Sequence, residues 1–236
     1  TAVIPYYGYG RSDKKDQPRV PITARLLADL LTVAGANRVL TIDLHAGQIQ
    51  GFFNIPVDEL TAFPILARYY KDKRLTDAVV VAVDIGISKR ARDVAERLGV
   101  PLAIVEKRRV ANNAQSELLN IIGDVRGRTA ILVDDEVLTG GSMLNAVTAV
   151  KAAGALKVYA CCSHGLLPGN APQRIMDGPI EELVLTDTIQ LAPEKRDGKI
   201  VVISIADLLG EAIRRIHSGL SVGAMFEDKQ WAALAP

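Results

Sequence analysis

The chain has 236 residues, is 49% hydrophobic, and carries 28 Lys and Arg residues against 27 Asp and Glu residues. This length and composition allow one large domain or two small domains with buried cores. The nearly balanced charge argues against general attraction to nucleic acid or to an anionic membrane, so any anion site has to be local. The longest apolar runs, such as residues 78–83, are far too short to span a bilayer.

Short β-rich runs alternate with amphipathic helical patterns along the chain. Because this order is typical of a mainly parallel sheet covered by helices, we predict an α/β fold. The first helix is expected to place Leu26, Leu27, Leu30 and Leu31 on one face and to end at Gly35. The predicted strands are 38–44, 77–83, 102–105, 129–133 and 157–163, and the predicted helices are 23–34, 64–70, 89–98 and 142–153.

Two further features bear on the context of the chain. Its first residue is Thr1 rather than Met, inside a strand-like run, so we expect that it begins within a larger protein. Its two cysteines, Cys161 and Cys162, are neighbours in an apolar run. A disulfide between neighbours is strained, so we expect reduced core residues and a cytoplasmic protein.

Charged or metal-capable side chains follow several of the predicted strands. In a parallel sheet the carboxyl ends of the strands meet at one edge, and ligands bind there. We therefore predict a shared site at this edge, although strand ends are also ordinary loop positions. The residues concerned are Asp43, His45, Asp84, Lys107, Arg109, Asp134 and Asp135.

The stretch VDDEVLTGGS, residues 133–142, combines two acids with a glycine pair. Gly140 and Gly141 permit a tight turn, and Ser142 is expected to open the next helix. Backbone N–H groups at a helix N-terminus bind phosphate, and Thr139 and Ser142 add hydroxyl donors. Because carboxylates suit sugar hydroxyls or Mg²⁺, the stretch predicts a sugar-phosphate site.

Two other phosphate-binding motifs are excluded. The segment LTGGSM, residues 138–143, lacks the lysine of a Walker-type loop. The segment GYGRSD, residues 8–13, lacks the third glycine of a dinucleotide fingerprint.

Residues 129–147 resemble the phosphoribosyl-diphosphate motif of the type I phosphoribosyltransferase-like proteins. Five further stretches resemble the ribose-phosphate diphosphokinases, also called phosphoribosyl diphosphate synthetases: IPYYGYGRSDKK, PITARLLADLL, DLHAGQIQGFF, EKRR and IRRIHSGLSVGAMF. The resemblance runs essentially from end to end, with an N-terminal portion of the family pattern absent. It implies transfer of the β,γ-diphosphoryl group of ATP to the anomeric hydroxyl of ribose 5-phosphate. The products would be phosphoribosyl diphosphate and AMP.

The resemblance also implies a role for each candidate residue. Lys107 and Arg109 would stabilise the transferred group and are the expected catalytic residues. The expected ATP-binding residues are Arg11, Ser12, Asp13 and His45, and the expected Mg²⁺ ligands are His45, Asp84 and Asp43. The expected ribose 5-phosphate residues are Asp134, Asp135, Thr139, Gly140, Gly141 and Ser142.

The family architecture implies two phosphoribosyltransferase-like domains with mainly parallel sheets flanked by helices. Residues 1–57 would belong to the first domain, completed by about 213–236, and residues 58–212 would form the second. A homo-oligomer is expected, as a hexamer built from dimers, with ADP and phosphate as effectors. Residues 217–222 resemble part of the family's allosteric site, and 108–117 read as a long loop that could serve as a lid.

Several positions depart from the family pattern. Leu138 stands where an acid is usual, Ser12 where Gln is usual and Asn54 where Asp is common; Val110-Ala111 and Ala82-Val83 also differ. Two alternatives therefore stay open. One is a catalytically weak regulatory homologue. The other is a phosphoribosyltransferase, which would share residues 129–147 but would not explain DLHAGQIQGFF or EKRR.

Overall fold

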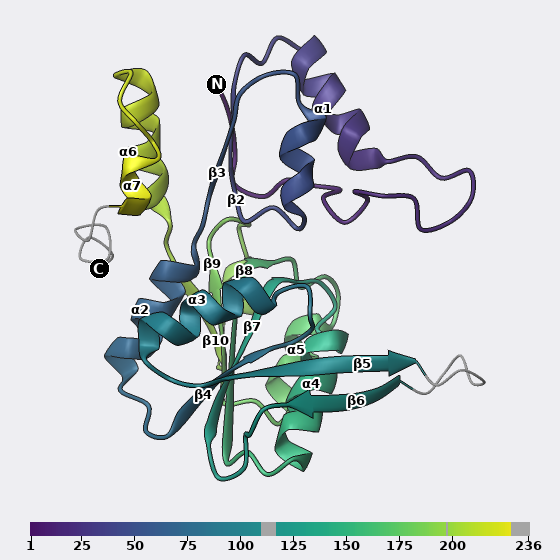
Figure 1. The fold of residues 1–236 in the computed structure, drawn as a ribbon, viewed down its shortest axis with the longest axis vertical. Helices are drawn as coiled ribbons and strands as arrows, with labels where there is room; N and C mark the ends of the chain where they lie inside the picture. The colour runs from purple at the N-terminus through teal and green to yellow at the C-terminus, as the bar shows by residue number, and fades with distance from the viewer. Residues whose placement is uncertain (110–116, 197, 228–236) are drawn as a thin grey trace.

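The computed structural model describes residues 1–109, 117–196 and 198–227, with the backbone alone at 107–109, 117–118 and 226–227. The chain forms two sheets, a smaller one of three strands and a larger one of seven, stacked along the long axis of the molecule (Figure 1). Helices flank both sheets, so the predicted α/β class with mainly parallel strands is confirmed.

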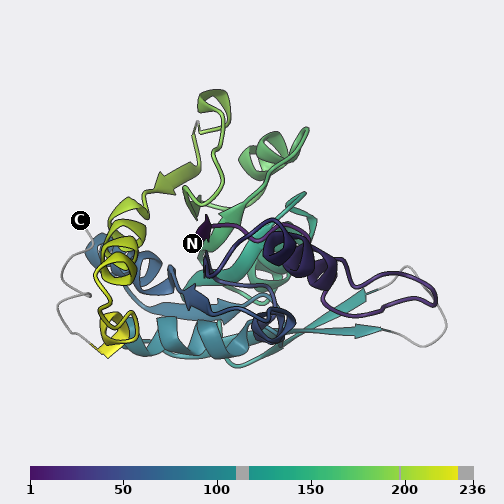
Figure 2. The same cartoon turned by 90° about the horizontal axis from the view of Figure 1, so that it is seen from above.

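The smaller sheet is parallel, in the order β1 (Ala2–Ile4), β2 (Val39–Ile42), β3 (Val57–Leu60). Helix α1 (Thr23–Val33) lies on one side of it, and α6 (Ala206–His217) and α7 (Ala224–Glu227) on the other (Figures 1 and 2). Alternate side chains of β2 serve the two sides. Val39 packs with Ala24 and Ala28, whereas Leu40 and Ile42 pack with Leu208 and Ala212.

The larger sheet has the order β10-β9-β8-β7-β4-β5-β6. Strand β6 pairs antiparallel with β5, and the other neighbouring strands pair in parallel. Cys161 and Cys162 are free and buried in β8, as predicted. The strands are β4 (Ala78–Ala82), β5 (Leu102–Arg109), β6 (Glu117–Ile122), β7 (Thr129–Val137), β8 (Lys157–Gly165), β9 (Glu182–Thr186) and β10 (Ile200–Ile203). The helices of this part are α2 (Phe63–Lys73), α3 (Ser88–Leu98), α4 (Gly141–Ala152) and α5 (Ala171–Asp177), with short 3₁₀ turns η1 (Gly47–Phe52) and η2 (Pro193–Lys195) elsewhere.

The order in which the chain adds strands to the larger sheet changes direction between β4 and β7, which pair in parallel. From β4 the chain crosses to β5, whereas from β7 it crosses the opposite way to β8 and β9. Right-handed crossovers then place α3 and α4 on opposite faces, which opens a crevice at the carboxyl ends of these two neighbouring strands. The register pairs Ala82 with Val133, so Asp84 and Asp134 emerge side by side at that crevice.

Two strands extend four residues beyond their predicted ends. Strand β5 continues to Arg109 because it pairs with β6, and β7 continues to Val137 because it pairs with β8. Lys107 and Arg109 therefore lie in a strand rather than after one, and the same holds for Asp134 and Asp135. The predicted loop begins and ends in β5 and β6, and its central residues 110–116 fall outside the described ranges, as does its use as a lid.

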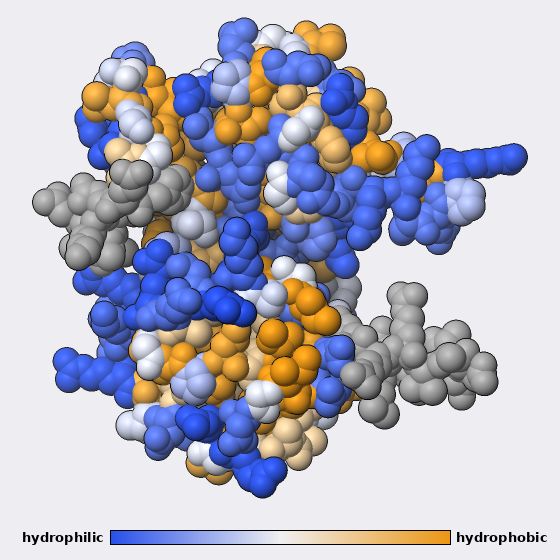
Figure 3. Space-filling model, in the orientation of Figure 1, coloured by the Kyte–Doolittle hydropathy of each residue, from blue (hydrophilic) through white to orange (hydrophobic). Residues whose placement is uncertain are grey.

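The expected apolar face of α1 is only half correct. Leu27 and Leu31 pack against the smaller sheet, but Leu26 and Leu30 are 51% and 56% exposed. The buried stripe runs instead through Ala24 and Ala28, whose small side chains let the helix approach the sheet closely. Hydrophobic residues accordingly appear on the surface over α1 (Figure 3). No helix within the described residues is long and apolar enough to cross a membrane.

The division between the two sheets lies close to the expected boundaries. Strand β3 still belongs to the smaller sheet, so the chain passes to the larger one only after Leu60. At the other end, α6 packs on the smaller sheet from Ala206 onward, which is earlier than residue 213. The division into two phosphoribosyltransferase-like domains stays a prediction.

Candidate active site

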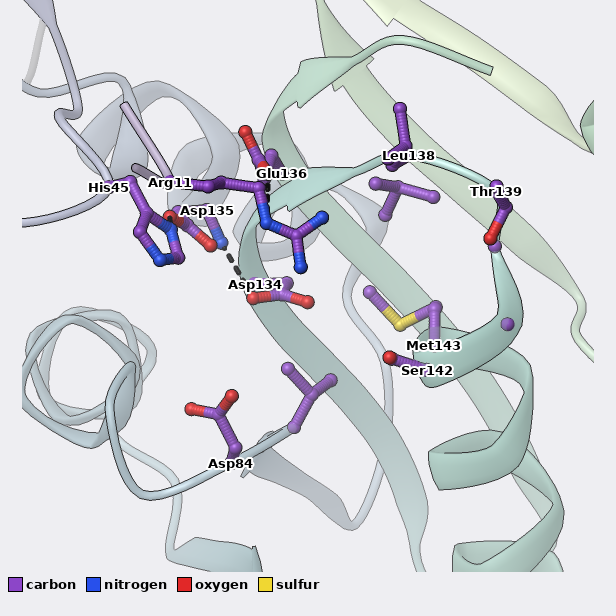
Figure 4. Close-up of a pocket in the computed structure, with 14 residues that line it drawn as sticks. Arg11, His45, Asp84, Asp134, Asp135, Glu136, Leu138, Thr139, Ser142 and Met143 are labelled. Carbon is purple, nitrogen blue, oxygen red and sulfur yellow. Dashed lines mark hydrogen bonds and ion pairs between the residues drawn. The ribbon is translucent and has the colours of Figure 1, made fainter. Parts of the chain in front are cut away.

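A cavity of about 230 Å³ lies between the two sheets (Figure 4). Arg11 and His45 enter it from loops of the smaller sheet. Asp84 enters it from the turn after β4. The remaining wall is the continuous run 134–143, which carries the end of β7, the glycine turn and the start of α4. The predicted edge of the sheet therefore faces the smaller sheet across a hollow.

A second cavity of about 610 Å³ adjoins the first. Four residues, His45, Asp84, Asp134 and Asp135, line both cavities. The rest of the second cavity comes from residues 46–48 and from the turn at 85–87 with Lys89 and Arg90 at the start of α3. The four shared residues thus stand between two spaces, and this arrangement has room for two ligands in contact.

The glycine turn presents the N-terminus of α4 to the first cavity. Gly140 has φ +76°, a left-handed conformation that favours glycine, and α4 begins at Gly141, one residue before the predicted Ser142. Leu144 N donates the first intrahelical hydrogen bond to Gly140 O at 2.9 Å, so the N–H groups of residues 141–143 precede the ladder. Within the described residues no side chain caps this helix end. It is therefore suited to an anion.

His45 and Asp135 form the closest polar contact in the cavity. His45 Nδ1 lies 2.6 Å from Asp135 Oδ2. This hydrogen bond raises the pKa of His45 above its usual value despite partial burial. Burial alone would raise the pKa of Asp135, but the hydrogen bond and charge of His45 outweigh burial and lower it. When neutral His45 donates from Nδ1, the lone pair of Nε2 is left for a ligand or metal.

Asp134 behaves differently from its neighbour. Burial, followed by the negative charge of Asp135, raises the pKa of Asp134 to about 9. Its Oδ1 accepts a hydrogen bond from Asp135 N at 3.0 Å, which is too little compensation for a buried carboxylate. Asp134 therefore carries a proton near neutral pH until a cation or a hydroxyl donor stabilises its charged form.

Asp84 shapes the turn that leads into α3. Its Oδ1 accepts a hydrogen bond from Ile87 N at 3.2 Å. A Cβ atom on Gly86 would approach the same oxygen to 3.1 Å, so glycine gives this turn its clearance. Because Asp84 lines both cavities, its carboxylate can serve a ligand in either one.

The acids fit a magnesium ion that arrives with a substrate better than one enclosed by protein. Across the described ranges, no three His, Cys, Asp or Glu side chains gather closely enough to hold a metal by themselves. Mg²⁺ commonly takes one or two carboxylates and completes its octahedron with water and substrate phosphates. His45 and Asp84, which were predicted as ligands, lie where such an ion would meet a bound phosphate chain.

Glu136 is a charged residue of the first cavity that the sequence did not lead us to predict. Its side chain is 8% exposed, and Oε1 lies 3.3 Å from Arg11 Nε. Tyr6 donates its hydroxyl to Oε2 at 3.4 Å. Burial and the charge of Glu136 raise the pKa of Tyr6 to about 12, so the phenol stays protonated. The signal available in the sequence was the third consecutive acid of the run Asp134 to Glu136.

Three predicted site residues lie away from both cavities. Ser12 Oγ accepts a hydrogen bond from Thr23 N at 3.2 Å and so supports the start of α1. Asp13 is buried and accepts a hydrogen bond from Gln48 Nε2. Asp43 is 1% exposed, and its Oδ2 accepts hydrogen bonds from Ala62 N and from Ser163. Asp43 has φ +42°, and its carboxylate binds β8 and the start of α2 instead of facing the site.

The two predicted catalytic residues lie on β5. The backbones of Lys107 and Arg109 pair with Leu119 and Glu117 of β6. Their side chains are outside the described part of the structure, so their roles stay predictions. Val110 and Ala111 are outside it entirely, and Leu138, 36% exposed, lines the first cavity beside Thr139.

Two family models match the chain. The model described as the phosphoribosyl synthetase-associated domain matches residues 109–227, and the model described as the N-terminal domain of ribose phosphate pyrophosphokinase matches residues 1–35.

Curated relatives agree with the family models. A ribose-phosphate pyrophosphokinase of Caldanaerobacter subterraneus subsp. tengcongensis is 56% identical over 226 residues, which are 95% of this chain and 71% of that protein. One from Clostridium perfringens is 51% identical over 230 residues, covering 96% of this chain and 72% of that protein.

A solved structure gives the same result. The crystal structure of phosphoribosylpyrophosphate synthetase from Mycobacterium smegmatis superimposes with a TM-score of 0.84 at 41% identity. The match covers 92% of this chain and 71% of that one. The resemblance predicted from the motifs is thus confirmed over nearly all of this sequence. The chain belongs to the ribose-phosphate pyrophosphokinase family.

Proposed function

We propose that this protein makes phosphoribosyl diphosphate by transferring the β,γ-diphosphoryl group of ATP to the anomeric hydroxyl of ribose 5-phosphate, with AMP as the second product. Membership of the ribose-phosphate pyrophosphokinase family supports the reaction. One observation supports placing the sugar phosphate in the first cavity. The uncapped N-terminus of α4 shares this cavity with the carboxylates of β7 and with Asp84. An anion site beside an acid cluster suits a phosphorylated sugar.

Ribose 5-phosphate would occupy the first cavity. Its phosphate would accept hydrogen bonds from the N–H groups of residues 141–143 and from the hydroxyls of Thr139 and Ser142. Its ring hydroxyls would lie against Asp134 and Asp135, which can accept hydrogen bonds that a phosphate cannot offer. This orientation directs the anomeric hydroxyl toward the four residues shared with the second cavity.

The nucleotide would approach from the side of Arg11 and His45, with its phosphate chain passing Arg11 at the margin of the first cavity and reaching the residues shared with the second one. His45 and Asp84 would hold Mg²⁺, which neutralises the phosphate chain and orients it toward the sugar hydroxyl. Lys107 and Arg109 would stabilise the charge that develops on the transferred group. Because diphosphoryl transfer requires little covalent work from the protein, positioning and charge supply most of the catalysis.

The cellular setting is part of the same proposal. We expect a cytoplasmic homo-oligomer built from dimers into a hexamer, with ADP and phosphate as effectors. The exposed hydrophobic residues of α1, Leu26, Leu30 and Val33, are compatible with assembly, because such residues are commonly covered by protein contacts. Sedimentation velocity with and without phosphate measures the assembly directly.

The testing experiment is formation of AMP from ATP in the presence of ribose 5-phosphate and Mg²⁺. Omission of either should abolish the product, and Lys107→Ala should lower kcat sharply while ribose 5-phosphate still binds. Tight binding of both ligands without AMP would point instead to a regulatory homologue, which Leu138 favours because it replaces an expected acid in the first cavity. Release of diphosphate from phosphoribosyl diphosphate with a nucleobase would point to a phosphoribosyltransferase.

A further inference from the structure

Arg11 and Glu136 face each other from the two sheets. Arg11 lies in the loop between β1 and α1, whereas Glu136 lies in β7. Their contact joins Arg11 Nε to Glu136 Oε1 at 3.3 Å, with side chains that are 60% and 8% exposed. The buried carboxylate is thus fixed in the larger sheet, while the long cationic side chain reaches it from the smaller one.

The orientation of the Arg11 guanidinium follows from the nitrogen that makes the ion pair with Glu136. The ion pair occupies Nε, and Figure 4 shows the two terminal nitrogens of the guanidinium directed into the cavity. Among the residues that line this cavity, Arg11 is the one with a permanently charged cation, beside the four acids Asp84, Asp134, Asp135 and Glu136. An anion entering here therefore meets donors that Glu136 holds in place.

We propose that Glu136 is a positioning residue, which holds Arg11 so that the terminal amino groups of Arg11 meet the phosphate chain of the nucleotide. This inference rests on the proposed function, because that function places a nucleoside triphosphate beside Arg11. The sugar phosphate has its own donors at the start of α4, so Glu136 affects the nucleotide and leaves ribose 5-phosphate almost untouched.

Electrostatics alone predicts the opposite effect. Removing a buried negative charge from an anion site strengthens the binding of any phosphate by Coulomb's law. A 60% exposed arginine without its anchor, however, samples many rotamers and has to be ordered when the ligand binds. Weaker nucleotide binding after neutralisation of Glu136 would therefore show that its positioning of Arg11 outweighs its charge repulsion of the phosphates.

The test is a double-mutant cycle with direct binding as its readout. Affinity for a non-hydrolysable ATP analogue with Mg²⁺ is measured by calorimetry in the wild type, Glu136→Gln, Arg11→Ala and the double variant. We expect Glu136→Gln to weaken binding about two- to tenfold, the cost of ordering one long side chain. In the Arg11→Ala background the same substitution should have almost no effect, because Glu136 acts through Arg11.

Two controls make the result specific. Ribose 5-phosphate affinity, measured on the same samples, should be unchanged by Glu136→Gln. Asp29→Asn removes an acid from the exposed ion pair with Arg25 and should alter neither affinity. An equal change in both Arg11 backgrounds, a gain in nucleotide affinity, or an equal loss for ribose 5-phosphate would overturn the inference alone. A wild type that binds no nucleotide would overturn the proposed function with it.

Discussion

Nδ1 of His45 and Oδ2 of Asp135 lie 2.6 Å apart and join a loop of the smaller sheet to β7 of the larger one. The next residue of β7, Glu136, makes the second such connection through Arg11. Consecutive acids of one strand therefore bind groups from the facing sheet. The candidate active site exists only where the two sheets meet, and disturbance of either contact should alter the nucleotide side first.

The first prediction concerns the titration of His45. The hydrogen bond from Asp135 raises its pKa, so NMR of the histidine ring should show a midpoint above the ordinary 6.5. Asp135→Asn should lower that midpoint, because both the hydrogen bond and the negative charge are lost. His217, in the last turn of α6 and far along the chain, serves as the reference signal. A His45 midpoint at or below the ordinary value would contradict this assignment.

The same pair makes stability depend on pH. A raised histidine pKa contributes stability that is present below its unfolded value and is lost as pH rises through the folded value. A lowered aspartate pKa contributes stability that is present above its unfolded value and is lost as pH falls through the folded value. The stability gap between wild type and His45→Gln should therefore be widest at mildly acidic pH, as urea unfolding at several pH values can measure.

Asp134 should release a proton when a cation binds. With a pKa of about 9, its carboxyl is protonated near neutral pH. Calorimetry of Mg²⁺ binding with ribose 5-phosphate present, in buffers of different ionisation enthalpy, should reveal a proton leaving the protein. Affinity should rise with pH toward the pKa. Asp134→Asn should lose the buffer dependence, and an unchanged dependence in that variant would assign the proton elsewhere.

The two glycines of the turn should respond differently to alanine. At Gly140, φ is +76°, so Gly140→Ala should cost about 1–2 kcal/mol of unfolding free energy and weaken ribose 5-phosphate binding. Gly141→Ala is the matched control, because a Cβ there meets its nearest atom, Thr139 Oγ1, at an ordinary 3.7 Å. Its unfolding free energy should be unchanged. Equal losses in thermal unfolding would show that φ at Gly140 is not decisive.

A buried polar contact between the sheets provides a stability test. Ser163 is fully buried and donates to Asp43 Oδ2, so Ser163→Ala should cost about 1–3 kcal/mol by leaving that carboxylate less satisfied. Thr41 Oγ1 is also buried but has no hydrogen-bond partner among the described residues. Thr41→Val should therefore leave stability unchanged or raise it. Urea midpoints that fall equally for both variants would show that the hydrogen bond of Ser163 to Asp43 does not contribute to stability.

Much of the larger sheet was predictable because its strands are buried on both faces and read as continuous apolar runs. Strand β4 (78–82) was predicted within one residue at each end, and the start of β7 at Thr129 was predicted correctly, for that reason. Strands β5 and β7 were cut short because their ends carry charged residues, and only pairing with β6 and β8 explains why those ends remain extended. Tertiary pairing overrode local polarity there.

The parts of the candidate site that depend on neighbouring residues in the sequence were predictable. The segment 139–142 predicts the glycine turn from its composition, and Asp84 directly follows a strand that the apolar run predicts. The inward or outward direction of an acid after a strand is not local. Asp43 turns into the contact with Ser163, 120 residues later, whereas Glu136 meets Arg11 from the facing sheet. The acid run 134–136 marks Glu136 as a candidate, but the neighbouring residues do not identify the contact partner of either acid.

We expect sugar phosphate and nucleotide to react where the two cavities meet. Phosphorus NMR of the protein with ATP, ribose 5-phosphate and Mg²⁺ follows every product at once. We predict that AMP and phosphoribosyl diphosphate appear in equal amounts. A double variant that carries both Asp134→Asn and Asp135→Asn should form neither product. Formation of ADP with a product that carries one transferred phosphoryl group, or no turnover by the wild-type protein, would contradict diphosphoryl transfer at this site.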